Sequence, residues 1–356
     1  MTISEHWMTE TVRTTHRWSP PAQVLTADPQ HGVSTYARFL AHEVRDLIPH
    51  TRLHDAGAGF GPGFSSPGWI HLHFTDRLWG ADALAAAAAV EALAGAHRVI
   101  VTLHDVPQAS DGTHLRIRAE GYRRVIAAAS GVVVNSRHEV ELLREFTDPA
   151  VTAAVIPLPV HVPLAPPPGS ATSTLDGSVA ILGFVYPGKG HDRAIDAVAR
   201  IAPGFHRVPD VIALGRASAG HEADVRSLQQ HAAARGVRFE TTGYLSDAEL
   251  LRRSRQVSVP LIAHDHVSAS GSLASWISAR RRPIVLRSRY MQEMAALRPG
   301  TLTLVEPAEL ADAVAAALRD PASTWLDDNA EVRPTTGDTV EQYLDYWRAV
   351  MQENPE

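Results

Sequence analysis

The stretch GFVYPGKGHDRAIDAV, from Gly183 to Val198, decides the fold class of this chain. It continues the apolar run VAIL and leads through a glycine-rich loop into an amphipathic helix. A short apolar strand followed by a helix is the unit from which parallel sheets are built. The loop also suits a phosphate, because glycines such as Gly188 let backbone amides approach an anion and Lys189 adds a positive charge beside the helix start.

A structural turn with a solvated lysine is the other interpretation of this loop. The sequence GxxxxGK[ST] does not occur in the chain, so a P-loop ATPase is not indicated.

Apolar runs alternate with helical patterns on both sides of this stretch. In the first half we predict strands at 69–74, 99–105 and 131–136, with helices at 34–47, 81–94, 116–129 and 139–146. In the second half we predict strands at 179–184, 211–215, 237–244, 257–262, 283–287 and 301–306. The alternation predicts two α/β domains, each with a parallel sheet.

Dense proline between Val155 and Ser178 separates the two series of strands, because proline lacks an amide donor and fixes φ. We therefore predict an N-terminal domain over 1–160, a linker over 161–178 and a C-terminal domain over 179–335. The spacing of apolar residues also predicts a terminal helix within 336–356, able to pack back on the N-terminal domain.

Composition excludes several classes of function. The chain has 356 residues and a net charge of −6, so no basic field favours nucleic acid. It has no cysteine, which excludes disulfides and thiolate chemistry. The first residues do not resemble a secretory signal, and the apolar stretch 81–96 is too short to span a membrane, so we expect a cytoplasmic protein with at most peripheral membrane contact.

Ligands of such sheets bind beyond the carboxyl ends of the strands. Small residues follow one strand there, and Ser268, Ser270, Gly271 and Ser272 could donate to phosphate oxygens, although serine also caps helices without a ligand. Gly32 could bring a ligand close to the backbone, whereas Tyr36 on the next helix is expected to pack. His104 and Asp105 follow the predicted strand at 99–105, where His104 could bind a sugar hydroxyl or serve only as a structural histidine.

Other chemistries find little support in the sequence. His71 and His73 share one face of their strand, but no third ligand follows at suggestive spacing, so no metal site is expected. Neither the nucleophile elbow GxSxG nor a helix-opening GxGxxG is present. The glycine-rich segment 57–63 is interpreted as a flexible loop beside the ligand site.

The order of these motifs resembles glycosyltransferase family 4, a family of retaining GT-B enzymes with two Rossmann-like domains facing a cleft. The likeness runs from about Gln30 to Leu318 and is most specific in KGHD and GYLSDAELL. It also rests on HGVSTYAR, TLHD, VVVNSRHEVELL and RRPIV.

The resemblance implies a sugar transfer from a nucleoside-diphosphate donor without a metal ion or other cofactor. It assigns Lys189 to the β-phosphate, Gly32 to the diphosphate, and His104 to the transferred sugar, so that His104, Lys189 and Asp105 form the expected catalytic set. The expected donor site comprises Gly32, Gly188, Lys189, Arg216, Tyr244, Ser268, Ser270, Gly271 and Ser272. The acceptor-side candidates are Tyr36, His73 and Asp105.

The chain departs from the family pattern at an arginine and at a pair of glutamates. Phe184 occupies the place of an arginine, for which we expect Arg216 to substitute, and Ser268 and Trp276 occupy the places of two glutamates. The donor nucleotide, among UDP, GDP and ADP, and the acceptor therefore stay open. A nucleotide-sugar epimerase and a non-catalytic nucleotide-sugar binding protein are the alternatives.

Overall fold

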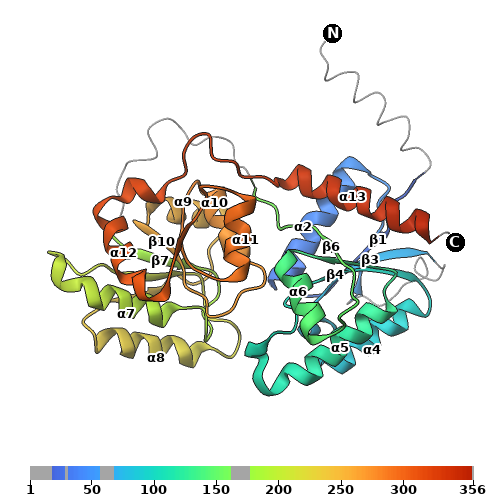
Figure 1. Ribbon diagram of the computed structural model, residues 1–356, viewed down its shortest axis with the longest axis horizontal. Helices are drawn as coiled ribbons and strands as arrows, with labels where there is room; N and C mark the ends of the chain where they lie inside the picture. Colours follow the sequence, from blue (N-terminus) through green and yellow to red (C-terminus); the bar gives the residue numbers. More distant parts are fainter. Residues whose placement is uncertain (1–17, 29–30, 57–67, 162–176, 355–356) are drawn as a thin grey trace, which may run out of the picture. The chain divides into compact units, whose positions relative to one another are not determined.

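The computed structural model describes residues 18–28, 31–56, 68–161 and 177–354, which form two compact units (Figure 1). The first unit comprises the chain up to Pro157 together with the segment from Thr339 onward, and the second runs from Leu158 to Asp338. Each unit contains a six-stranded parallel sheet with helices on both faces. The predicted fold class, two doubly wound α/β domains, is confirmed.

The first sheet has the strand order β2-β1-β3-β4-β5-β6. Its strands are β1 (Ala22–Leu25), β2 (Leu53–Asp55), β3 (Trp69–Phe74), β4 (Arg98–Leu103), β5 (Gly131–Val134) and β6 (Ala154–Val155). The predicted strands at 69–74, 99–105 and 131–136 correspond to β3, β4 and β5. The sequence analysis did not identify β1, β2 and β6, which have four, three and two residues.

Helices cover both faces of the first sheet because its strands alternate apolar side chains between them. On one face lie α4 (Ala83–Ala94), α5 (Leu115–Ala128) and α6 (Arg137–Phe146), against residues such as Leu72 and Val101. On the other lie α2 (Gly32–Leu47) and α13 (Thr336–Glu353), against Trp69, Ile100 and Val133. A single helical turn, α3 (Asp76–Trp79), and the 3-10 helix η4 (Ala109–His114) complete this unit.

The second sheet has the order β12-β11-β10-β7-β8-β9. Its strands are β7 (Val179–Leu182), β8 (Val211–Leu214), β9 (Phe239–Thr241), β10 (Val259–Ile262), β11 (Ile284–Leu286) and β12 (Thr303–Val305). All six were predicted. The helices α7 (His191–Ile201), α8 (Glu222–Ala233) and α12 (Leu310–Arg319) cover one face, and α9 (Asp247–Gln256), α10 (Gly271–Ser278) and α11 (Arg289–Leu297) the other. Short 3-10 turns lie at η5 (Ala202–Gly204), η6 (Pro307–Glu309) and η7 (Pro321–Thr324).

The terminal helix α13 packs its buried face on the first unit (Figure 1). Tyr343 and Trp347 are fully buried there beside Leu40 and Val44 of α2. The helix α13, which is distant in sequence from α2, thus covers part of the core of the first unit.

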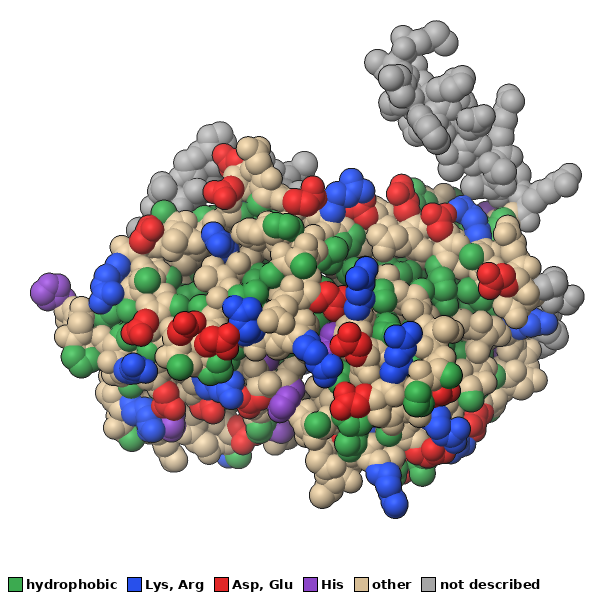
Figure 2. All heavy atoms as spheres, viewed as in Figure 1, with side chains coloured by type: hydrophobic (Ala, Val, Ile, Leu, Met, Phe, Trp, Pro, Cys, Tyr) green, Lys and Arg blue, Asp and Glu red, His purple; other side chains and the backbone are tan. Residues whose placement is uncertain are grey.

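Two of the predicted loop segments cannot be compared with the structure. Glycine-rich 57–63 and most of the linker, 162–176, lie outside the described residues. Among those described, no helix is long and apolar enough to cross a membrane. Figure 2 shows acidic and basic side chains interspersed on the visible face, as expected for a chain with mixed charges.

Candidate functional site

Each sheet reverses its direction of growth at one pair of strands. The reversal falls between β1 and β3 in the first sheet and between β7 and β10 in the second. Helices of successive connections then lie on opposite faces, which leaves an opening beyond the carboxyl ends of those two strands. The loops after β7 and β10 hold Lys189 and the segment 268–272, and the loop after β1 leads to Gly32.

Lys189 lies in the loop after β7 with only 6% of its surface exposed. A Cβ on Gly183 would come within 3.3 Å of the lysine Nζ, and the Nζ also lies 5.7 Å from the ring centre of Tyr186. No carboxylate pairs with Lys189 among the described residues. Burial lowers the pKa of this lysine from 10.5 to about 8, because a desolvated ammonium group without a counter-charge is destabilised.

The loop that holds Lys189 is fixed against the loop after β10. Gly190, with φ at 90°, passes so close that a Cβ would lie 2.1 Å from the carbonyl oxygen of Ala263. The amide of Asp265 donates to the carbonyl of Gly188 at 3.0 Å, and Asp265 itself pairs with Arg193. The Gly188 candidate therefore shapes the loop, and Lys189 is placed by backbone contacts.

Two histidines adjoin the lysine. Burial, followed by the charge of Lys189, lowers the pKa of His191 to about 3 and the pKa of His264 well below its ordinary value. Both ring nitrogens of His191 and the Nε2 of His264 are buried without a hydrogen-bond partner in the described chain. Because both imidazoles are neutral, they do not compensate the positive charge of the buried Lys189. An anionic ligand would supply the missing negative charge.

In the segment 268–272, both the hydroxyl group and the backbone amide of Ser270 form hydrogen bonds within the protein. The Ser270 hydroxyl caps α10 by accepting from the Leu273 amide at 3.2 Å, and its own amide donates to the Tyr290 hydroxyl at 3.0 Å. Ser270 is thus engaged by the protein, and Ser268 is buried. Gly271 is exposed and a Cβ there would meet nothing within 4 Å, so its amide and that of Ser272 stay candidates for an anion.

The structure shows what surrounds the positions at which the sequence resemblance leads one to expect other residues. Trp276 is fully buried in the core between the sheet and α10, so its side chain faces core residues such as Leu273 and Ile277. The guanidinium of Arg216 lies 5.6 Å from the ring centre of Phe184, so the two residues meet beyond β7 and β8. Tyr244, after β9, has 78% of its surface exposed.

In the first unit, His73 and His104 form a buried pair. The Nδ1 of His73 lies 2.9 Å from the Nε2 of His104, and the Nδ1 of His104 lies 3.2 Å from the Nδ2 of Asn135. The edge of the Tyr36 ring packs against both histidines, with centroids at 5.3 and 5.9 Å. Tyr36 therefore packs, as expected, but it does so against polar side chains.

The remaining candidates surround this pair. Gly32 is the exposed first residue of α2, and a Cβ there would meet nothing within 4 Å, so packing does not require this glycine. His31 caps α2 by accepting from the Val33 amide at 3.2 Å. His71 contacts Gln23 and Thr102, each at 2.9 Å, so its partners are neutral groups. Among the described residues, no group of three His, Cys, Asp or Glu is arranged to hold a metal ion.

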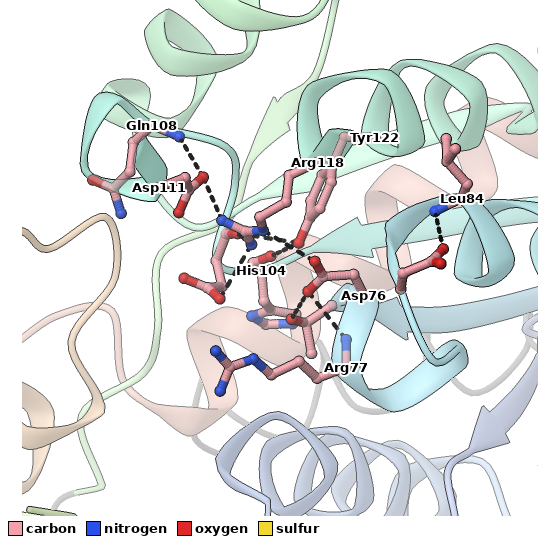
Figure 3. Close-up of polar contacts among 11 residues, drawn as sticks. Asp76, Arg77, Leu84, His104, Gln108, Asp111, Arg118 and Tyr122 are labelled. Atoms are coloured by element: carbon pink, nitrogen blue, oxygen red, sulfur yellow. Dashed lines mark hydrogen bonds and ion pairs between the residues drawn. The ribbon is translucent and has the colours of Figure 1, made fainter. Parts of the chain in front are cut away.

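Asp105 occupies a left-handed backbone conformation, with φ at 49°, directly after His104. Figure 3 shows the guanidinium of Arg118 between Asp111 and Asp76. Its guanidinium donates to the Asp105 carbonyl at 2.5 Å and pairs with Asp76 at 3.0 Å and Asp111 at 2.5 Å. The Tyr122 hydroxyl donates to the His104 carbonyl at 2.7 Å. Together these contacts hold the turn, while the Asp105 side chain stays 58% exposed.

Arg118 also pairs with the Asp105 carboxylate at 3.3 Å, so the exposed side chain has a partner within the protein. Sequence reasoning missed Arg118, Asn135 and His264. Arg118 and His264 lie far along the chain from the groups they adjoin, and Asn135 offered only its position at the end of a predicted strand.

No protein-family model and no curated protein sequence matches the chain. The structure is similar to that of HepE from Anabaena, solved with UDP and glucose, with a TM-score of 0.66 over 93% of this chain and 99% of that chain at 14% identity. Sucrose-phosphate synthase from Thermosynechococcus elongatus gives 0.67 over 94% and 97% at 15% identity. The galactosyltransferase WaaB gives 0.58 over 95% and 100% at 13% identity. The fold is therefore that of the GT-B glycosyltransferases.

Proposed function

We propose that this protein is a retaining, metal-independent glycosyltransferase that moves a sugar from a nucleoside-diphosphate donor to an acceptor hydroxyl. The observation that carries the proposal is the buried and unpaired Lys189 at the reversal point of the second sheet. The similarity of the whole chain to glycosyltransferases solved with UDP supports it as an analogy of fold.

Lys189 is the only lysine in the sequence, while every other basic position uses arginine or histidine. A buried ammonium group destabilises the fold, so its retention requires a compensating role. A diphosphate supplies the missing negative charge and accepts hydrogen bonds from the ammonium group. The neighbouring His191 and His264 can each donate one further hydrogen bond while neutral.

Two more features of the second unit suit a nucleotide. Arg216 presents a cation at the end of β8, beside the Phe184 ring, and we assign it the role of the family arginine. Tyr244 exposes an aromatic face after β9, on which a nucleobase can stack. The Gly271 and Ser272 amides at the start of α10 add donors for phosphate or sugar oxygens.

In the proposed reaction, the acceptor hydroxyl attacks the anomeric carbon on the face from which the phosphate leaves. The bond to the diphosphate oxygen breaks, and the departing oxygen takes the proton of the acceptor. Negative charge develops on the diphosphate, so Lys189 and Arg216 stabilise the transition state more than the ground state. Asp105, fixed by Arg118, and the histidine pair of the first unit are assigned to the sugar and acceptor.

The first test is thermal stabilisation of the protein by UDP, GDP and ADP. A ligand that binds only the folded state raises the melting temperature, and we expect one nucleotide to do so. Lys189→Ala should reduce the shift, whereas Arg200→Ala, which removes an exposed charge from the following helix α7, should leave it unchanged. If none of the three nucleotides stabilises the wild type, the proposal is wrong.

Product analysis then separates the proposed function from its alternatives. With the matching nucleotide sugar and a panel of sugar acceptors, a transferase releases nucleotide and forms a glycoside. An epimerase alters the donor without an acceptor, and a binding protein leaves it unchanged. The buried Trp276 and the serine at 268, in place of two glutamates, make the binding protein the alternative to test.

A further inference from the structure

The first unit contains a buried polar network between the sheet and the helices α2 and α13. His71 and His73 lie on β3, Thr102 on β4, and His104 follows β4. Each of these side chains is at least nine-tenths buried. The Nε2 of His73 has no hydrogen-bond partner in the described chain, and neither does the Oδ1 of Asn135, which joins the network at His104.

Glu139 determines which atoms donate in the hydrogen bonds that connect Asn135, His104 and His73. Its Oε2 accepts from the Asn135 backbone amide at 2.7 Å, so the side-chain atom of Asn135 that faces the same oxygen at 3.5 Å is the NH₂ group. That NH₂ group donates to the Nδ1 of His104. A neutral imidazole has one donor and one acceptor, so His104 donates from Nε2 to the Nδ1 of His73.

His73 therefore carries its proton on Nε2, the atom without a partner. Burial lowers the pKa of His73 well below its ordinary value and that of His104 to about 3, so both rings are neutral near neutral pH. A buried N–H donor that nothing satisfies is rare in folded proteins and points to a bound acceptor. Both nitrogens of His104, in contrast, are already engaged by the protein.

His71 provides an internal comparison, because it lies two residues earlier on the same face of β3. Its Nδ1 donates to the Gln23 Oε1, since the Gln23 NH₂ group is used by the Pro21 carbonyl. Its Nε2 then accepts from Thr102. His71 thus has the opposite tautomer to His73, and both of its nitrogens are satisfied.

We propose that His73, through its Nε2–H, binds a hydroxyl oxygen of a carbohydrate, and that His104 is a positioning residue that fixes the tautomer of His73. This inference rests on the proposed function for the identity of the ligand. The carbohydrate is either the transferred sugar or the acceptor, since both present hydroxyl oxygens.

The tautomers can be measured without any ligand by nitrogen NMR of the ¹⁵N-histidine-labelled protein, with assignment by single substitutions. We expect a protonated Nε2 in His73 and His104 and a protonated Nδ1 in His71. Asn135→Leu removes the donor that faces the Nδ1 of His104, so the protonated Nε2 form of His104 and His73 should lose population while His71 does not change. A protonated Nδ1 in wild-type His73, or an unchanged His73 in the variant, would overturn the positioning role.

The ligand is tested with UDP-glucose, or with the GDP or ADP sugar when the nucleotide screen selects that base. A shift of the His73 Nε2 signal with the nucleotide sugar, but not with the nucleotide alone, supports contact with the transferred sugar. A shift that requires nucleotide diphosphate plus free glucose supports contact with the acceptor. If neither moves the signal while the nucleotide is bound, the atom holds only water and the inference fails.

A matched pair of variants gives a second readout. His73→Asn keeps a group at the Nδ1 position for His104 but removes the Nε2–H, so we expect about tenfold weaker binding of the nucleotide sugar with the nucleotide alone unaffected. His71→Asn removes a similar volume from the same strand and should leave the ratio of the two affinities unchanged. Equal losses in both variants would contradict a specific contact. Failure of every nucleotide to bind would instead contradict the proposed function, and the tautomer measurement would still decide the role of His104.

Discussion

At the scale of single residues, burial gives Lys189 a cost to the stability of the fold. Its side chain is buried, and its pKa of about 8 in the folded protein lies below the ordinary 10.5. The unfolded chain therefore binds a proton more readily than the folded protein between these values. The protonated lysine destabilises the fold below about pH 8, and this cost disappears as the pH rises toward 10.5.

We predict that Lys189→Met is more stable than the wild type at pH 7, by up to about 3 kcal/mol, because the uncharged side chain has no desolvation cost. The difference should shrink as the pH rises from about 8 to 10.5. Denaturant unfolding at several pH values measures it, and the same variant should lose stabilisation by nucleotide. If Lys189→Met is less stable than the wild type at pH 7, other groups of the protein already offset the desolvation of the ammonium group.

Single residues also limit the catalytic set proposed from the sequence. His104 was expected to contact the sugar, yet both of its ring nitrogens are hydrogen-bonded to His73 and Asn135. Arg118 contacts both the carbonyl and the carboxylate of Asp105, whose side chain is 58% exposed. In the first unit, His73 thus keeps a ring nitrogen without a partner, whereas His104 does not.

At the scale of elements, the junction between β7 and α7 depends on glycine for two different reasons. Gly188 and Gly190 both have positive φ, at 83° and 90°. A Cβ at position 188 would meet only the Asp265 carboxylate at 3.4 Å, whereas at position 190 it would overlap the Ala263 carbonyl at 2.1 Å. The second contact is with backbone, which cannot rotate away.

We therefore predict that Gly188→Ala costs about 1 to 2 kcal/mol, the cost of a left-handed conformation. Gly190→Ala should cost clearly more, because the backbones of two loops must separate. Denaturant unfolding of the two variants gives the comparison, and only Gly190→Ala should also weaken nucleotide binding, since it displaces the loop of Lys189. Equal costs in both variants would show that the loop after β10 moves easily.

At the scale of the whole molecule, each unit has a core of its own. Trp347 of α13 is fully buried in the first unit, and Trp276 of α10 is fully buried in the second. Removing a buried tryptophan side chain costs about 3 to 5 kcal/mol. The two residues therefore report separately on the two units.

We predict that Trp347→Ala lowers the stability of the first unit and that Trp276→Ala lowers that of the second. Calorimetry should resolve which transition each variant moves. The nucleotide should raise the transition that Trp276→Ala lowers, because Lys189 and Arg216 belong to the second unit. A nucleotide that raises only the transition affected by Trp347→Ala would place its site in the first unit and contradict the proposal.

The sequence by itself determined the repeated strand and helix pattern and the position of the glycine-rich loop around Lys189. Both are local properties: apolar periods of β3 or β7 need a few residues, and the glycines around Lys189 are neighbours in the chain. The strands β2 and β6 were not predicted. Their pairing with β1 and β5 defines them as strands more than their own composition does.

Only the tertiary structure decided which polar groups remain available to a ligand. His73 and His104 meet across two strands, and Asn135 reaches them from the end of a third. Trp276 occupies a family glutamate position but faces the core. Tautomer, burial and the pKa of Lys189 depend on atoms brought together by folding, and no pattern along the chain encodes their distances.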